Sequence, residues 1–301
     1  MKASEICQSD KRLSRSEGLL RWVQFCNTQN LERFLPFFCG EISLGWIPRD
    51  CLAWFAEEPR VFRIGNDTVL LQPDLKTPES RTAVLSEVLL EWKELGRIPG
   101  WRDELYRVCN YFDAEPFFCI ERAAATLFGI CSYGVHLNGI QGSPRQELLW
   151  LARRSRDRPQ YPGCLDNLVA GGLTAEMNPE EVLIRECMEE AGISEELARL
   201  ARPCGYVTVF MELGGRIKRD LLFCYDLELP PSFVPCNQDG EVESFHLKTF
   251  GEVEALIAGT DEIKLNCNLV MIDFLVRHGR IRPEDPFYAG IVAGLRGGGV
   301  A

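Results

Sequence analysis

The sequence predicts an α/β fold in which helices cover a mixed β-sheet. Runs with the two-residue period of strands alternate with runs of helical period, and several strand runs meet in pairs at glycine-rich or Asn-Asp turns. The 301 residues suffice for one large domain or two of ordinary size. We expect a polar, disordered segment (1–20), a smaller α+β domain (21–118) and a larger domain with C-terminal helices (119–301).

The first of these domains contains one strand pair and two helical patterns. Residues 60–73 read as two strands joined at a turn formed by Asn66 and Asp67. Residues 80–96 carry apolar side chains at helical spacing and end at a glycine, which predicts a helix. The segment 116–130 has a similar pattern and predicts a second helix.

The second domain contains most of the predicted strands. Residues 132–142 and 146–155 read as two strands around a Gly-Ser-Pro turn, and residues 205–229 read as a long hairpin about a Gly-Gly pair. Residues 239–257 predict a strand followed by a short helix. Residues 268–279 predict a helix that ends at a glycine. Helices therefore follow strands in an order that suits a covered sheet.

Charge and composition narrow the classes of partner. The net charge of −11 argues against nonspecific binding to nucleic acid or to an anionic membrane. No apolar run reaches the length of a membrane span, and the polar N-terminus lacks the apolar centre of a signal peptide. The 13 cysteines are odd in number and form no Cys-x-x-Cys pair, which favours buried thiols in a reducing compartment. We expect a cytoplasmic protein that binds a small molecule.

One dense basic run, "RRSRDR" at 153–158, stands out against the negative net charge. Arginine forks suit phosphate oxygens, so Arg153, Arg154 and Arg158 are candidates for binding a diphosphate. A solvated loop explains a run this short equally well. Both interpretations stay open on the residues alone.

A capped acidic helix is predicted shortly afterwards. Asn178 is a good N-cap, Pro179 suits the first helical position, and Glu181 sits where a capping box needs a carboxylate. Gly192 is well placed to end the helix. The pattern therefore predicts one helix with defined ends over residues 179–191.

The two sides of this helix differ in character. At about 100° per residue, one arc is apolar and the opposite arc is acidic; the apolar residues are Leu183, Ile184, Cys187, Met188 and Ala191, and the acidic residues are Glu186, Glu189 and Glu190. Like charges three and four residues apart repel, and no lysine lies between Leu168 and Ile193 to offset them. Mg²⁺ and Mn²⁺ prefer such hard oxygen ligands, which suggests metal-assisted attack of water on a phosphoanhydride.

These residues resemble the Nudix box of the MutT-like Nudix hydrolases, whose pattern is G-x5-E-x7-R-E-U-x-E-E-x-G-U with U aliphatic. The matching positions are Gly171, Arg185, Glu186, Glu189, Glu190, Gly192 and Ile193, with Cys187 at the first aliphatic position. The resemblance implies an α/β/α sandwich and a diphosphohydrolase. It also implies that Glu186, Glu189 and Glu190 hold Mg²⁺ or Mn²⁺, often with the Gly171 carbonyl, and that Arg185 belongs to the catalytic set.

One position departs from the family pattern. Met177 stands where the family has its first glutamate, and Glu176 lies one residue too early. In the family that glutamate pairs with the arginine of the box. Here Glu181 lies four residues before Arg185 and is the expected substitute partner. The departure is compatible with a slower site and also with a decayed one.

Further segments resemble the Nudix hydrolases related to thiamine pyrophosphokinase, which carry an extra N-terminal domain. They include "ERAAATLFGICSYGVHLNGI", "YPGCLDNLVAGGL" and "MIDFLVRHGRIRPEDPFY". This resemblance suggests thiamine diphosphate or its oxidised analogues as substrate, cleaved to the monophosphate. Two alternatives stay open: a hydrolase of ADP-ribose or NADH, and a catalytically silent ligand-sensing module. The N-terminal domain would act as a lid, or as a dimerisation element that makes a homodimer.

Several residues outside the box are further candidates. Glu241 and Glu243 alternate on a predicted strand, so both carboxylates should share one face and add a metal ligand or general base. A solvent-facing pair is the plain alternative. The residues expected to shape the substrate pocket are Tyr161, Asp166 and Asn167.

Overall fold

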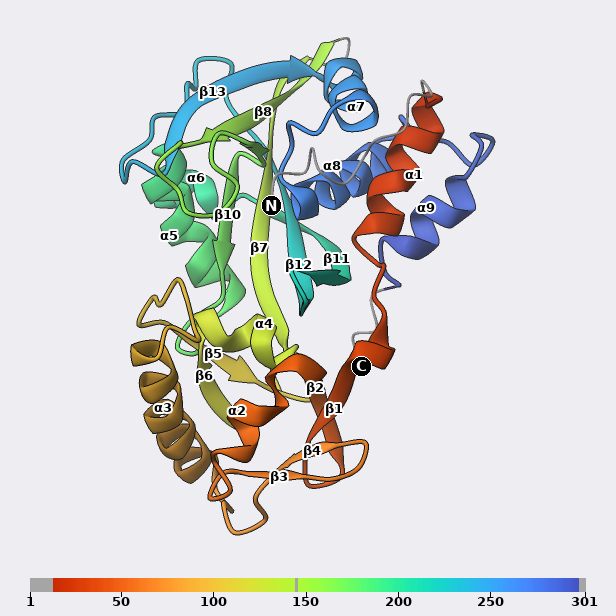
Figure 1. The fold of residues 1–301 in the computed structure, drawn as a ribbon. Coiled ribbons are helices and arrows are strands. Elements are labelled where there is room, and N and C mark those ends of the chain that lie inside the picture. Colours follow the sequence, from red (N-terminus) through yellow and green to blue (C-terminus); the bar gives the residue numbers. More distant parts are fainter. Residues whose placement is uncertain (1–12, 144–145, 298–301) are drawn as a thin grey trace.

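A seven-stranded mixed sheet forms the centre of the larger domain (Figure 1). Its path runs β11-β12-β7-β8-β13, with β10 paired to β7 and β9 paired to β8. The bounds are β7 Cys131–Ser143, β8 Gln146–Arg154, β9 Leu165–Asp166, β10 Val169–Gly172, β11 Arg202–Leu213, β12 Arg216–Glu228 and β13 Val242–Thr249. Strands β12 and β7 are parallel and the other pairs are antiparallel, which confirms the mixed sheet and both predicted hairpins. This computed structural model describes residues 13–143 and 146–297.

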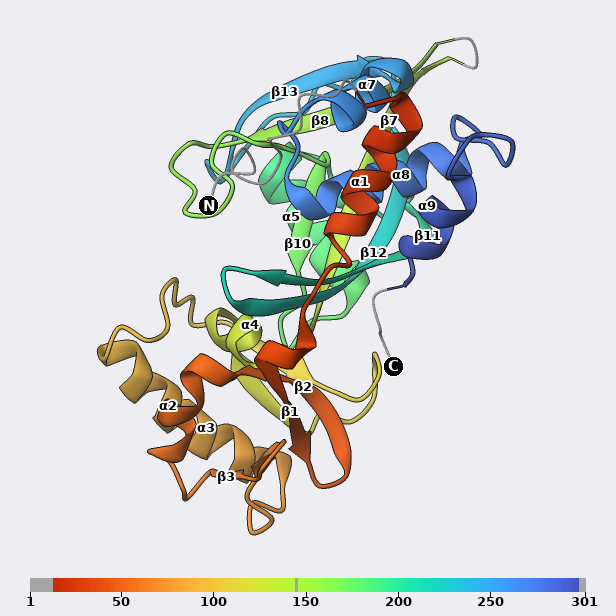
Figure 2. The same cartoon turned by 45° about the vertical axis from the view of Figure 1, so that its right-hand side comes forward.

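Helices cover both faces of this sheet and make an α/β/α sandwich (Figure 2). One face packs against α5 (Pro179–Ala191) and α6 (Glu195–Ala198), and the other packs against α7 (Phe250–Gly259), α8 (Leu265–Arg277), α9 (Tyr288–Gly294) and α1 (Arg15–Phe25). Neighbouring residues of β12 show the division, since Leu221 joins the core under α5 and Leu222 joins the core under α8. The predicted sandwich is confirmed, and α8 begins three residues before the predicted start at residue 268.

Helix α1 corrects the prediction of disorder over residues 1–20. Residues 1–12 lie outside the described part of the chain, but the helix begins at Arg15, and Ser14 with Glu17 completes a capping box. Leu19, Trp22 and Val23 form an apolar stripe that packs on the C-terminal helices. The Trp22 indole Nε1 donates to the Ile257 carbonyl at 2.7 Å. The helix forms because this stripe is buried against α7, α8 and α9, a contact that its local sequence does not reveal.

The N-terminal domain has its own small sheet, in the order β2-β1-β4-β3. The elements are η2 (Leu31–Arg33), β1 (Phe34–Cys39), β2 (Ile42–Pro48), η3 (Arg49–Cys51), α2 (Leu52–Ala56), β3 (Phe62–Ile64), β4 (Val69–Leu71) and α3 (Pro78–Glu94). Phe37, Phe55, Phe62, Trp92 and Phe128 build an aromatic core. The predicted strand pair and the first predicted helix are both confirmed.

The predicted helix over 116–130 is only partly formed, and the boundary at 118 falls inside a strand. Strand β6 (Phe118–Glu121) pairs with β5 (Leu105–Val108), and only then come η4 (Arg122–Ala124) and the short helix α4 (Ala125–Phe128). Phe118 and Ile120 alternate into the N-terminal core, so this segment takes the strand period. The core continues to Ile130, and the larger domain's sheet begins at the next residue.

Two further findings concern the described residues. Their cysteines are all free thiols, most of them buried or partly buried. None of their helices is both long and apolar enough to pass through a lipid bilayer.

Candidate active site

Helix α5 has the predicted ends. The Asn178 side chain accepts from the Glu181 backbone N–H at 3.0 Å, and the Glu181 carboxylate accepts from the Asn178 N–H at 2.9 Å. Pro179 opens the helix, and Gly192 ends it in the left-handed conformation with φ of 63°. The capped helix follows β10 at a short distance along the chain, so its side chains meet the glycine pair at the end of that strand.

The three box glutamates differ in burial. Glu190 is buried, and its Oε2 accepts from the Ala170 backbone N–H at 2.8 Å. Glu186 lies over Gly171, where an added Cβ would come within 2.4 Å of the Glu186 Cγ. Glu189 is half exposed, with 51% of its side chain accessible. Two of the three carboxylates therefore line the edge between α5 and β10, and the third faces solvent beside them.

The predicted apolar arc needs one correction. Leu183, Cys187 and Ala191 are buried as expected, but Met188 is 48% exposed while the carboxylate of Glu190 is buried. The strand β10 covers the helix on the Glu190 side, so the buried arc is rotated toward that side. Helical periodicity gave the relative angles of the side chains but not the direction of the sheet.

Arg185 does not take the predicted substitute partner. Glu181 uses its carboxylate to cap the helix, so it is not paired with Arg185. Arg185 Nη1 instead donates to the Met177 Sδ at 3.0 Å, and Nη2 donates to Glu186 Oε1 at 2.7 Å. Its Nε lies 4.0 Å from the Glu189 carboxylate. The methionine thus leaves Arg185 paired with the carboxylates of the box themselves.

The charges of the buried carboxylates are only partly compensated. Burial raises the pKa of Glu186, although the Arg185 guanidinium opposes the shift. Burial and the neighbouring Glu186 raise the pKa of Glu190 well above its usual value, although the Ala170 N–H opposes this. A small cation beside these groups would supply the missing compensation, and hard oxygen donors are what Mg²⁺ and Mn²⁺ prefer. The donor set therefore fits the predicted divalent metal.

Glu186 and Glu189 line a cavity of about 810 Å³, here called the cleft, and Glu190 is buried behind them. Both domains line it. Despite the net charge of −11, its lining is rich in cations: Arg97, Arg102, Arg122, Arg154, Arg158, Arg185, Arg216, Lys218 and Lys264. The cleft is a local basic environment of the kind that attracts and holds anions.

The arginine side chains of the basic run 153–158 do not all face the cleft. Arg154, Arg158 and Tyr161 line the cleft, so all three stay candidates for binding the substrate. Arg153 is turned away from it; its Nη1 donates to the Gly163 carbonyl at 2.8 Å. Successive residues of a strand point to opposite faces, so Arg153 and Arg154 could not both reach the cleft.

Asp166 and Asn167 lie beneath the wall of the cleft rather than on it. Asp166 Oδ2 accepts from Arg154 Nη1 at 3.0 Å and from Lys264 Nζ at 2.9 Å. The Asn167 side chain is buried and bonds to His136 Nδ1 at 3.0 Å. Asp166 therefore holds two cleft cations in place, and neither predicted residue contacts the cavity itself.

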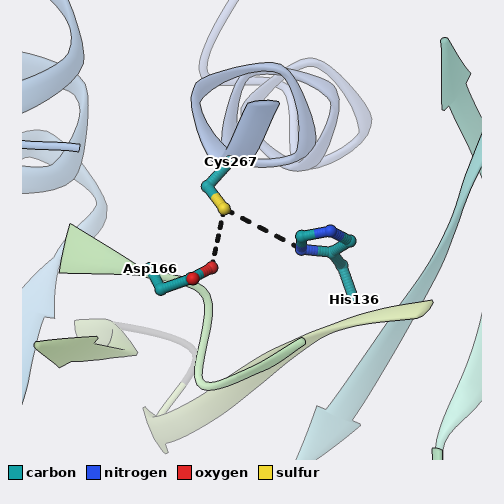
Figure 3. A group of neighbouring side chains, drawn as sticks. All are labelled: His136, Asp166 and Cys267. Carbon is teal, nitrogen blue, oxygen red and sulfur yellow. Dashed lines mark hydrogen bonds between the residues drawn. The ribbon is translucent and has the colours of Figure 1, made fainter. Parts of the chain in front are cut away.

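A second group of potential metal ligands, His136, Asp166 and Cys267, lies in the same region (Figure 3). The Cys267 Sγ is 2.6 Å from Asp166 Oδ1 and 4.0 Å from His136 Nδ1. Burial raises the pKa of the Cys267 thiol well above its usual value and lowers the pKa of His136 to about 4. The thiol thus donates to a carboxylate that Arg154 and Lys264 already neutralise. A further cation would be repelled, so this is a hydrogen-bonded network that supports the cleft.

Glu241, just before strand β13, and Glu243, within it, do not share one face. Glu241 lines the cleft and forms an ion pair with Arg158. Glu243 pairs with Arg156 at 3.5 Å and is not part of the lining. The pairing of β13 with β8 shifts register between residues 242 and 244, and this irregularity breaks the alternation that should have placed both carboxylates on one face.

Sequence reasoning missed several lining residues. Lys218 and Asp220 form an ion pair at 2.7 Å on β12, and their two-residue spacing on a predicted strand was an available signal. Tyr106 and Arg122 reach the cleft from the N-terminal domain, and nothing local in the sequence links them to the Nudix box.

Comparison with known proteins identifies the family. The profile described as NUDIX domain matches residues 138–265, and the one described as Domain of unknown function (DUF4743) matches residues 18–132. Over 303 residues the chain is 43% identical to Nudix hydrolase 20, chloroplastic, of Arabidopsis thaliana, covering 97% of this chain and 81% of the relative. It is also 43% identical over 286 residues to Nudix hydrolase 24, chloroplastic, of the same plant, covering 93% and 78%.

Among solved structures, DR0079 from Deinococcus radiodurans aligns with a TM-score of 0.43 and 19% identity, over 56% of this chain and 97% of that one. The two plant relatives establish the family of this chain, because their sequence identity extends over nearly its whole length. The protein belongs to the Nudix hydrolase family.

Proposed function

We propose that this protein is a divalent-metal-dependent hydrolase of a phosphoanhydride bond. The observation that carries the proposal is the meeting of two box glutamates with strand β10 beside a basic cleft: Glu186 lies against Gly171, and Glu190 accepts from the Ala170 N–H. Carboxylates in this arrangement suit Mg²⁺ or Mn²⁺, and the arginines around them suit the diphosphate. The names of the two plant relatives, both Nudix hydrolases, support the same activity.

Different residues in and around the cleft would bind the metal, orient the substrate and accept a proton. Glu186, Glu189 and Glu190 would hold the cation, with the Gly171 carbonyl beside them. When bound, the cation neutralises phosphate oxygens and lowers the pKa of the attacking water. Arg154 and Arg158 orient the diphosphate from the side of strand β8. Glu241, held in place by its ion pair with Arg158, is the candidate to accept the proton from water.

We infer thiamine diphosphate or its oxidised analogues as the substrate class, with the monophosphate as product. The resemblance to the thiamine pyrophosphokinase-related branch supports this, and a cavity of about 810 Å³ suits a ligand of that size. ADP-ribose and NADH form the alternative class, and the cavity volume also suits them. A panel of thiamine diphosphate, its oxidised forms, ADP-ribose and NADH, with Mg²⁺ and a phosphate or monophosphate readout, separates the two classes.

One observation favours the silent ligand-sensing module as a second candidate. Met177 leaves Arg185 bound to Glu186, so a cation must compete with an arginine for that carboxylate. Calorimetry with Mn²⁺ tests this alternative, because a module that has lost its metal should show no heat of binding.

Substitutions on helix α5 test the metal site. Glu189→Gln and Glu190→Gln should each lower turnover by about two orders of magnitude or more while the fold survives, since each removes a charge that the cation needs. Glu180→Gln is the matched control, because Glu180 lies on the same helix, is 65% exposed and pairs with Arg199 away from the cleft. Near-wild-type turnover in both the Glu189 and Glu190 variants would reject the site.

Two predictions from the sequence stand as proposals. A cytoplasmic location follows from the composition alone, and the names of both plant relatives carry the word chloroplastic. A homodimer is the other, and size-exclusion chromatography with light scattering would test it.

A further inference from the structure

We propose that Arg122 of the N-terminal domain, supported by Tyr106, binds the diphosphate of the substrate, so that both domains build the active site. This inference rests on the proposed function and extends it to a domain described only as one of unknown function.

The hairpin that carries these residues is docked on the loop before helix α5. Leu105 pairs with Glu121 at the end of the β5–β6 ladder, and the Arg122 backbone N–H donates to the Glu104 carbonyl at 2.8 Å. The Leu105 carbonyl accepts from the Ala175 N–H at 2.7 Å, which ties the hairpin to the chain between β10 and α5. In Figure 1 the hairpin lies just below α5. Arg122 therefore has a fixed position relative to the Nudix box.

The glycine pair of the box allows the hairpin to come close. A Cβ built on Gly172 would lie 2.3 Å from the Tyr106 Oη and 3.6 Å from the Arg122 Cζ. The preceding residue, Gly171, is the one that contacts the Glu186 side chain. Neighbouring glycines of β10 thus meet the two groups, Gly171 meeting Glu186 and Gly172 meeting Arg122, and Arg122 is close enough for the Glu186 carboxylate to raise its pKa.

Its contacts hold Arg122 in place but leave much of its guanidinium available. Nη1 donates to Glu104 Oε2 at 2.7 Å, and the guanidinium lies 5.6 Å from the centre of the Tyr106 ring. An arginine has five N–H donors in a planar fork, and 39% of this side chain is exposed in the cleft. Burial works against the charge, yet Tyr106, Glu104 and Glu186 raise the pKa of Arg122 above its usual value.

The ion pair with Glu104 would by itself serve a structural role. The position of Arg122 adds a second role, because a diphosphate held beside Glu186 and Glu189 presents its oxygens within a basic cleft that Arg122 also lines. Arginine forks bind phosphate oxygens with two parallel hydrogen bonds, which fix orientation as well as charge. Arg154 approaches from strand β8 and Arg158 from the loop that follows it, whereas Arg122 approaches from the other domain, so the diphosphate is held from two sides.

Calorimetry of the full chain with methylenediphosphonate and Mg²⁺ tests the proposal, because this diphosphate analogue cannot be hydrolysed. Arg122→Met should weaken its binding about tenfold or more, and Arg122→Lys, which keeps the charge without the fork, should weaken it severalfold. Arg60→Met is the control: Arg60 is in the same domain and pairs with Glu58, but it lies outside the cleft. That variant should bind as the wild type does.

The outcomes separate the two levels of inference. Wild-type affinity for methylenediphosphonate in both Arg122 variants would overturn the role of Arg122 and leave the proposed function standing. Loss of Mn²⁺ binding by Arg122→Met, together with loss of the analogue, would show that the residue only supports the fold, and would also overturn it. A wild-type protein that binds neither the analogue nor Mn²⁺ would remove the proposed function and this inference with it.

Discussion

Replacing Gly171 with alanine is the sharpest test of how the box is assembled. The added Cβ would lie 2.4 Å from the Glu186 Cγ and 2.7 Å from both its Cδ and Oε1. Ordinary contacts between carbon atoms need at least about 3.5 Å, so the Glu186 side chain must move by roughly 1 Å. A misplacement of about 1 Å in a catalytic group costs on the order of 100-fold in rate. We expect kcat to fall by about that factor.

The assay compares Gly171→Ala with a glycine that has room. Gly259 is the last residue of α7, and apart from its chain neighbours and its own helix backbone no atom of the described residues lies within 4 Å of the position that its added Cβ would take. Gly259→Ala should therefore keep full turnover. Both variants should unfold within a few degrees of the wild type, because neither glycine has a left-handed φ. Calorimetry with Mn²⁺ should show weaker binding for Gly171→Ala alone. Wild-type kcat and Mn²⁺ affinity in Gly171→Ala would refute the packing argument.

The remaining predictions concern charge. Met177→Glu should give Arg185 a new carboxylate partner and free Glu186, so Mn²⁺ should bind several times more tightly in calorimetry. Unchanged or weaker binding would contradict this. His136 is buried, and its pKa is lowered from 6.5 to about 4 in the folded protein, so the unfolded chain takes up the proton first as the pH falls. Its contribution to stability is present above pH 6.5 and is lost as the pH falls toward 4. Between pH 7 and pH 5 this loss is about 2 kcal/mol. Urea unfolding at the two pH values should show a smaller difference for His136→Gln than for the wild type, and equal differences would contradict the assignment.

Local patterns were enough to predict helix α5 and its site. Its caps at Asn178 and Gly192, and the spacing of Glu186 and Glu190 from Gly171, all lie within about two dozen residues. The physics that decides them, namely backbone capping and helical period, acts over the same short range. The long hairpin of β11 and β12 was predictable for the same reason, because its Gly-Gly turn is local.

Features that depend on the register and packing of distant elements could not be predicted from the sequence. Which of Arg153 and Arg154 faces the cleft depends on how β8 pairs with β13. The burial of Asp166 depends on Lys264, about 100 residues later. The position of Arg122 was not predictable for another reason. Its segment has apolar residues at helical spacing, whereas the residues just before Arg122 form a strand of the N-terminal domain.

The position of helix α1 has a consequence for how the chain acquires its shape. Leu19 and Trp22 leave the ribosome well before the helices that cover them, because α7 to α9 are made more than 200 residues later. Until α7 to α9 have been synthesised, this apolar stripe has no native partner. Contacts of such long sequence separation close slowly. A nascent chain arrested before residue 250 should therefore expose that stripe to chaperones, while its N-terminal aromatic core is already complete.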